Sequence, residues 1–226
     1  MYELVILGFL MRMPYHGYLI AKIINDMIGP FARLSNGRLY PLLAKLEQEG
    51  LIVPAPEEAV PAPLRADRDR QHHSYQITDA GRHRFHELMM DTTSNPGEYR
   101  RIFWFKLPNL HWLEPAERLY LLDHYINFCQ THLFHLTTER RDLERKAAQI
   151  DIMSAEQLEA SLEAMRIIRD QWQLELDSTR AWRERELAKI EKQQQPQEPQ
   201  PEGMQTKTDD SQAPPASNGR RRRPPT

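Results

Sequence analysis

The residues best suited by type and spacing to do chemistry lie in one short segment, LSNGRLYPLLAKLEQEGLI, residues 34–52. Its leucines recur at helical spacing, which predicts a short helix with an apolar stripe of Leu39, Leu42, Leu43 and Leu46. The opposite face carries an amide, two cations and a phenol, from Asn36, Arg38, Tyr40 and Lys45. Such a helix suits insertion into the major groove of DNA, where polar side chains read base edges. A surface helix that contacts only water has the same pattern.

Both ends of this helix are predicted by residue type. Ser35 and the asparagine after it can accept the free backbone N–H groups of the first turn. Gly50 can adopt the left-handed conformation that ends a helix, which places Leu51 against Leu46. Pro41 lacks a helical N–H, so the helix should begin near Pro41 or bend there.

The elements around this helix must position it. Apolar patterns and turn residues predict helices over about 3–12, from His16 to the Gly29-Pro30 stop, and over about 80–90, with strands at 51–53 and 74–77. This order is typical of a winged helix–turn–helix. The long segment between the strands would be the wing, and it carries a basic cluster diluted by Asp67 and Asp69: Arg65, Arg68 and Arg70, with His72 and His73 beside them.

The second half of the sequence is predicted to be helical. After a linker at 91–98, a short aromatic helix covers 99–107, and a long helix starts at Glu114-Pro115. Its apolar residues alternate three and four apart, as in a coiled coil. A turn at 151–154 and a last helix over 155–192 predict an antiparallel hairpin. Because two helices bury little alone, a second subunit is expected on that seam, at Leu122, Ile126, Leu133 and Leu136.

Aromatic residues are dense near the predicted junction and on the last helix. They include Tyr99, Phe103, Trp104, Phe105, Trp112, Trp172 and Trp182. Such residues pack cores and subunit interfaces, or line a pocket for a planar aromatic compound. The candidates for lining such a pocket are Trp104, Trp112 and Trp172.

Composition excludes several classes of protein. The single cysteine, Cys129, excludes an internal disulfide and a multi-thiolate zinc site. The first apolar run, residues 4–11, is too short to span a membrane, so a soluble cytoplasmic protein near the nucleoid is expected. We find no phosphate-binding glycine loop or nucleophile motif, and expect neither enzymatic activity nor a cofactor or metal. On one helix face, His132, His135 and Glu139 fit either a zinc site or, more simply, a solvated surface.

Charge does not mark the chain as a nucleic-acid binder. The formal net charge is −2, and residues 1–90 hold ten Lys or Arg and ten Asp or Glu. The final segment, residues 193–226, contains seven Pro and seven Gln, which predicts disorder. It closes on the run from Arg220 to Arg223, which is either a non-specific anchor for nucleic acid or a solvated basic end.

Three motifs, HGYLIAKII, SNGRLYPLLAKLEQEGLI and SYQITDAGR, resemble the PadR family of bacterial transcriptional regulators. FKLPNLHWLEPAERLYLL, from Phe105, resembles the start of that family's helical region. The resemblance covers about residues 3–190; the long proline-rich wing segment and the tail depart from it. It implies a homodimer that binds a palindromic operator, usually represses transcription, and in several members is released by a small aromatic effector. By resemblance, Ser35, Asn36, Arg38, Tyr40 and Lys45 lie on the recognition helix, and Arg65, Arg68, Arg70 and His73 on or beside the wing.

These observations predict an α+β fold that is mainly α, with an N-terminal winged helix–turn–helix followed by an all-helical, coiled-coil-like dimerisation region. The predicted boundaries are 1–91 for DNA binding, 98–192 for dimerisation and effector binding, and 193–226 for the tail. The predicted partners are double-stranded operator DNA, a second copy of the chain and a small aromatic ligand. The alternative is a dimeric coiled-coil scaffold whose winged helix binds protein.

Overall fold

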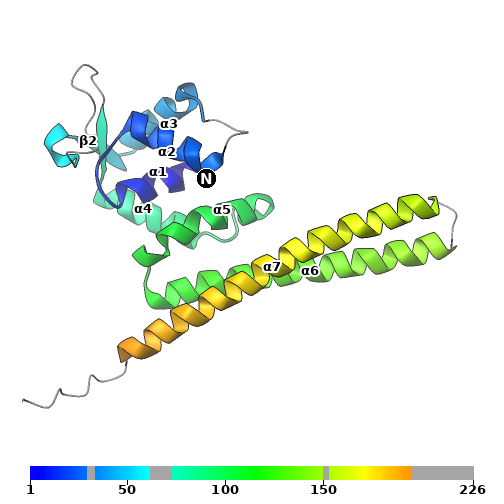
Figure 1. Cartoon of the computed structure of the whole chain (residues 1–226). Coiled ribbons are helices and arrows are strands. Elements are labelled where there is room, and N and C mark those ends of the chain that lie inside the picture. Colours follow the sequence, from blue (N-terminus) through cyan, green and yellow to red (C-terminus); the bar gives the residue numbers. More distant parts are fainter. Residues whose placement is uncertain (30–33, 62–72, 150–152, 195–226) are drawn as a thin grey trace, which may run out of the picture.

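A computed structural model describes residues 1–29, 34–61, 73–149 and 153–194 of the chain. Figure 1 shows a winged-helix part at one end and a long pair of helices that extends away from it. The first part consists of α1 (Tyr2–Leu10), β1 (Tyr15–His16), α2 (Gly17–Ile28), α3 (Asn36–Gln48), β2 (Ile52–Ala55), η1 (Glu57–Ala59), β3 (Ser74–Ile77) and α4 (Asp79–Met90). The second consists of η3 (Pro96–Glu98), α5 (Tyr99–Lys106), η4 (Leu107–Trp112), α6 (Pro115–Gln149) and α7 (Ala155–Gln194).

The sheet is a three-stranded antiparallel sheet in the order β1-β3-β2. Ile52 of β2 pairs with Ile77 of β3, which confirms the predicted hairpin. The sequence analysis missed β1, in which Tyr15 pairs with Tyr75. Two residues are too few to show alternation, and their partner lies about sixty positions away, so only tertiary contact defines this strand.

The core of the winged-helix part forms around α1. Five of its side chains are buried: Leu4, Val5, Ile6, Leu7 and Leu10. A helix that is apolar on nearly all sides belongs inside a protein, and α1 packs against both α2 and α4. Arg84 of α4 reaches back to Glu3, with 2.8 Å between Nε and Oε1, which fixes the outer end of this packing.

The end of α3 is as predicted, and its start is at the predicted residue but without the predicted side-chain cap. Gly50 has φ of +71°, and the Leu51 N–H donates to the Leu46 carbonyl at 2.9 Å, the long bond of a Schellman motif. Ser35 is the N-cap residue, but its side chain makes no capping hydrogen bond. The helix also runs through Pro41 instead of beginning there. Both Pro41 and Gly37 are exposed, so water can bond to the carbonyl that Pro41 leaves without a donor.

The two long helices pack against each other as the predicted antiparallel hairpin. Trp172 and Leu176 of α7 are buried in the same core as five side chains of α6: Leu121, Leu122, Tyr125, Ile126 and Cys129. Helix α7 ends at Gln194, two residues beyond the predicted end, and the rest of the predicted tail lies outside the described residues. Within the described part of the chain, no helix is long and apolar enough to cross a membrane.

Two of the residues predicted to join subunits are in the core of a single chain. Leu122 is 0% exposed and Ile126 is 9% exposed, so a second copy cannot contact them in this structure. The periodicity identified a real apolar seam, but α7 of the same chain covers it. Leu133 and Leu136 are half-buried beside that core. Other apolar side chains of the hairpin are exposed: Tyr120, Phe134, Ile167, Ile168 and Leu174.

Candidate nucleic-acid interface

Helix α3 presents a polar face that its leucines hold in place from behind. Leu39, Leu43 and Leu46 are fully buried. The predicted contact residues on this helix and its cap, namely Ser35, Asn36, Arg38, Tyr40 and Lys45, are all exposed. The geometry can therefore present these side chains to a groove without disturbing the core.

The sequence analysis missed the centre of this face. At 100° per residue, the positions directly opposite the buried leucines are Gly37, Pro41, Ala44 and Gln48, and all four are exposed. Arg38 and Lys45 flank this line on one side and Tyr40 on the other. Small apolar groups suit contact with a thymine methyl, and an amide suits adenine. Drawing the helical wheel around the leucines would have identified these residues.

Two contacts between α2 and α3 set the orientation of the face. The Leu34 N–H donates to Oδ1 of Asn25 at 2.6 Å, and Nδ2 of Asn25 donates to the Leu34 carbonyl at 3.2 Å. At Gly17, a Cβ would lie 3.1 Å from the Tyr40 ring and 3.3 Å from Leu43, so the helices approach more closely than a larger residue allows. Tyr40 therefore packs partly on α2.

Thr78 joins the end of α3 to the start of α4. Its hydroxyl donates to the Gly50 carbonyl at 2.7 Å and accepts from the Gly81 N–H at 3.0 Å. A Cβ on Gly81 would lie 2.0 Å from the Leu51 carbonyl oxygen, so only glycine fits there. Because β2 starts directly after Leu51, these contacts also fix where the hairpin leaves the domain.

The electrostatics of the face are modest. Lys45 lies 3.6 Å from Glu49, and both side chains are largely exposed, so this pair contributes little. Arg38 makes no ion pair with the described residues. Of the wing candidates, Arg65, Arg68 and Arg70 lie outside the described residues. His73 is exposed at the base of the wing, where its carbonyl accepts from the Gly17 N–H at 3.2 Å.

Residues 6–87, which include this whole helix–turn–helix and hairpin, match the model of the transcriptional regulator PadR-like family. Through this region the chain is similar to that family. The predicted resemblance is thereby confirmed, and the family is one of transcriptional regulators. No curated protein matches the sequence.

Several solved structures are similar to this chain at low identity. Bacillus subtilis PadR in complex with operator DNA is 19% identical, with 80% of this chain and 95% of that chain covered and a TM-score of 0.33. The same protein with p-coumaric acid is 20% identical, with 78% and 97% covered and a TM-score of 0.33. The Vibrio cholerae virulence activator AphA is 22% identical, with 85% and 99% covered and a TM-score of 0.33.

The three tryptophans proposed for effector binding have different surroundings in the structure. Trp104 and Trp112 are exposed on α5 and η4. Trp172 is buried on α7, where its ring stacks on His132 with 4.2 Å between centroids and lies 4.6 Å from the Arg100 guanidinium. Burial leaves Trp172 little surface for a ligand. The His132 ring is engaged in this stack, and no metal-binding group of three or more side chains occurs among the described residues.

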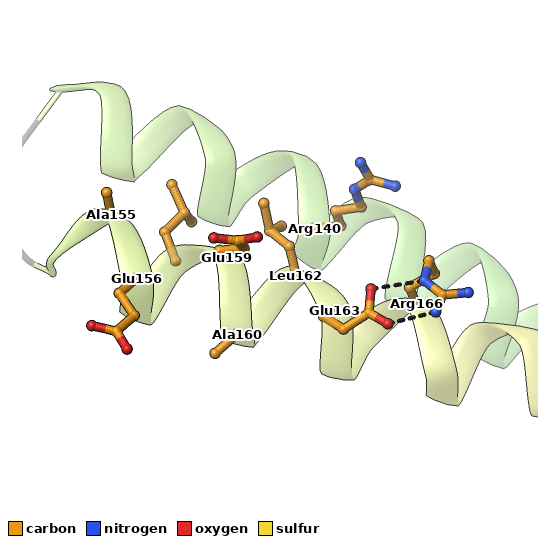
Figure 2. A pocket seen from close by; sticks show the side chains of 9 residues that line it. Arg140, Ala155, Glu156, Glu159, Ala160, Leu162, Glu163 and Arg166 are labelled. Carbon is orange, nitrogen blue, oxygen red and sulfur yellow. Dashed lines mark hydrogen bonds and ion pairs between the residues drawn. The ribbon is translucent and has the colours of Figure 1, made fainter.

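A hollow beside Trp104 lies between the end of α2 and α5. Met27, Ile28, Arg101 and Phe105 complete its lining. A larger hollow lies at the far end of the hairpin, where Leu158 and Leu162 form an apolar floor between α6 and α7 and Glu163 pairs with Arg166 (Figure 2). None of the predicted binding residues lines that second hollow.

Polar contacts connect the winged-helix part to the helical region. On α4, His86 lies 2.7 Å from Glu117 of α6, measured from Nε2 to Oε1. Lys106 is fully buried and donates to the Asp91 carbonyl at the end of α4, at 2.5 Å. Burial lowers the pKa of Lys106 to about 8.

A second group of polar contacts lies inside the helical region. Tyr125 donates to Glu175 at 2.5 Å, and Arg100 pairs with the same carboxylate, so α5, α6 and α7 meet there.

Proposed function

We propose that this PadR-like chain is a DNA-binding transcriptional regulator whose α3 enters the major groove. The observation that carries the proposal is the exposed face of α3, which is polar at its flanks, small at its centre and backed by buried leucines. Arg38 would discriminate bases, and Lys45 would contact phosphate. The wing arginines Arg65, Arg68 and Arg70, with His73, would add phosphate contacts.

The chain would act as a homodimer on a palindromic operator. Phe134 and Leu174 support this, because the side chains are 73% and 69% exposed on a hairpin whose seam is already filled. Each is a large apolar side chain exposed to water, which a contact with another subunit would bury. The second copy would cover this outer surface, with Leu133 and Leu136 at its edge. Repression is the expected outcome, because a dimer on an operator blocks polymerase.

A small aromatic acid would release the DNA by binding beside Trp104. The hollow there combines an exposed indole with the Arg101 guanidinium, groups that suit a flat anion. It borders Ile28, the last residue of α2, and α2 is the helix on which α3 packs. Such a ligand acts only if it binds the two forms of the dimer unequally. The probe is p-coumaric acid, with Trp104→Phe as the variant that should lose the response.

DNA binding by the full chain tests the function directly. We expect preference for one sequence upstream of its target gene over random DNA, with an affinity that falls steeply with salt. Arg38→Ala should relax preference at one base in each half-site by about 1–3 kcal/mol. Arg180→Ala, on the exposed surface of α7, is the matched control and should change neither affinity nor preference. Equal affinity for all sequences would contradict the proposal.

The alternative is a dimeric scaffold whose winged helix binds protein. The near-neutral charge of residues 1–90 favours this alternative, because most DNA-binding domains are basic. A scaffold would bind DNA weakly and without sequence preference, so the same titration distinguishes the two.

A further inference from the structure

The winged-helix part contacts the helical region outside the linker that joins them. Helix α5 lies between the winged-helix part and the hairpin (Figure 1). The chain crosses from one part to the other through eight residues, 91–98, between the end of α4 and the start of α5. Eight extended residues span up to about 26–29 Å, so the linker alone would allow many relative orientations. The orientation of α3 relative to the hairpin therefore depends on the other contacts.

The first of these contacts is between α1 and η4, at Gly8. This residue is buried in α1. The three heavy atoms nearest to an added Cβ all belong to Asn109: Nδ2 at 2.9 Å, Oδ1 at 3.2 Å and Cγ at 3.3 Å. The Asn109 side chain is buried, and its Nδ2 donates to the Phe105 carbonyl at 3.1 Å, so it is not free to move aside. A glycine inside a helix costs stability relative to alanine. Here the space that a side chain would need is taken by Asn109 of η4.

Two further contacts are on α4. At its end, Lys106 of α5 donates to the carbonyl of Asp91. In its middle, His86 contacts Glu117, whose second carboxylate oxygen accepts from the Glu114 N–H at 3.1 Å and is thereby fixed at the start of α6. Because one contact is on α1 and two are on α4, the three do not share a helix axis. Together they restrict rotation of the two parts as well as their separation.

Helix α3 belongs to the same rigid body as α1. Its buried leucines and the buried side chains of α1 are in one core. Helix α1 packs against α2, and α2 packs against α3. A change in the contact between α1 and η4 therefore moves α3 relative to the hairpin.

We propose that the contact between Gly8 and Asn109 determines which spacing of half-sites the dimer accepts. The inference rests on the proposed function, in which the hairpins join two chains and each α3 enters one half-site. One added base pair separates the half-sites by about 3.4 Å more and turns one by about 34–36° relative to the other. A dimer whose junctions are fixed cannot follow that turn. Both residues are buried, so they are positioning residues that act through the placement of α3 and not through contact with DNA.

The test measures binding of the full chain to its operator and to operators whose central spacer is one base pair shorter or longer. The spacing ratio is the affinity for the operator divided by the affinity for an altered spacer. In wild type it should reach about 10²–10⁴, because an altered spacer prevents tethered binding of the second half-site. Gly8→Ala should lower it by about tenfold, an ordinary effect for residues in contact. A change that only weakens the fold would lower both affinities by the same factor and leave the ratio unchanged.

A second variant and a double variant make the test specific for this contact. Asn109→Ala removes the amide from the other side and leaves α1 untouched, and it should also lower the spacing ratio. The double variant Gly8→Ala, Asn109→Ala places a methyl group in the space that the amide leaves, so its ratio should return towards that of wild type. Gly97→Ala, in the linker, is the matched control, because nothing lies within 4 Å of an added Cβ there. An equal fall in Gly97→Ala would show that the linker sets the spacing and would overturn the inference.

A distance measurement by pulsed dipolar spectroscopy needs no DNA. Spin labels are attached at Lys22→Cys on α2 and Arg180→Cys on α7, both exposed positions, in labelled chains diluted with unlabelled ones. Wild type should give one narrow distance distribution, and Gly8→Ala a shifted or broader one. A broad distribution in wild type, or an unchanged spacing ratio in both single variants, would overturn the inference and leave the proposed function intact. A wild-type chain that prefers no operator would overturn both.

Discussion

Different kinds of polar contact stabilise the winged-helix part and the helical hairpin. In the first, besides the ion pair between Arg84 and Glu3, side chains bond to backbone groups far along the chain: Asn25 to Leu34, and Thr78 to Gly50. In the second, side chains pair across helices, as Arg118 does with Glu186. Backbone contacts fix the path of the chain residue by residue, whereas ion pairs between two long helices fix only which faces meet. Backbone contacts suit a surface whose shape must stay constant, and ion pairs between helices suit a surface that a partner subunit completes.

The two parts also differ in how much of their apolar surface is covered. Leu43, at the back of α3, is 0% exposed. Leu174, on the outer side of α7, is 69% exposed. The hairpin therefore leaves apolar side chains exposed on its outer side, where the proposed second copy would bind. The following substitutions test this difference, beginning with the largest expected effect.

Leu43→Ala should lower the free energy of unfolding by about 2–5 kcal/mol, because it leaves a cavity behind α3. Leu174→Ala, the matched change on the hairpin, should alter the stability of the monomer by less than about 0.5 kcal/mol. Denaturant unfolding at low protein concentration measures both. Sedimentation should then show weaker dimerisation for Leu174→Ala alone. Equal losses of monomer stability would contradict the comparison.

Lys106→Met should change how stability depends on pH. Burial lowers the pKa of Lys106 to about 8 from an ordinary value of 10.5. Between these values the unfolded chain binds a proton that the folded chain has released, so the wild-type protein gains stability as pH rises through this window. The gain is at most about 1.4 kcal/mol per pH unit.

The measurement is the difference in unfolding free energy between wild type and Lys106→Met, at pH 7 and pH 10. Burial raises the pKa of Cys129 to about 12, which opposes the gain above pH 9 but is common to both proteins. We expect the variant to be favoured at pH 7 relative to pH 10. A difference that is constant with pH would show that Lys106 keeps its proton in the fold.

Asn25→Ala should cost about 1–3 kcal/mol, because it leaves the backbone groups of Leu34 without their side-chain partners in a buried position. It should also weaken operator binding, because the start of α3 loses its tie to α2. Asn36→Ala, on the exposed end of α3, should leave stability unchanged and affect only binding. Thermal unfolding and DNA titration of the two variants separate these effects, and equal stability of both would refute the role given to Asn25.

The smallest effects are expected for ion pairs of the hairpin. Asp123→Ala removes a pair with Arg183 that is partly open to water, and should cost no more than about 1 kcal/mol. Glu186→Ala should cost more, because that side chain is 7% exposed and pairs with both Arg118 and Lys189. Chemical denaturation of the two variants decides the order, and a larger loss in Asp123→Ala would reverse it.

Elements whose signals are local could be predicted from the amino-acid sequence. The left-handed Gly50 and the Schellman contact of Leu51 ended α3 as expected, since a helix terminus depends only on residues within a few positions. The apolar stripe of α3 likewise predicted the burial of Leu39, Leu43 and Leu46, whereas Leu42 of the same stripe is half-buried. The motifs around them were enough to indicate the family whose model residues 6–87 match.

Tertiary structure decided what covers each apolar surface. Leu122 and Ile126 lie on the seam that periodicity predicts, but periodicity does not say whether α7 or another subunit packs on it. Trp172 is likewise buried by Phe128 and His132, from a helix distant in sequence. The strand β1 exists only because β3 pairs with it. In each case the deciding contact joins residues far apart in the chain, and a local pattern carries no information about such a partner.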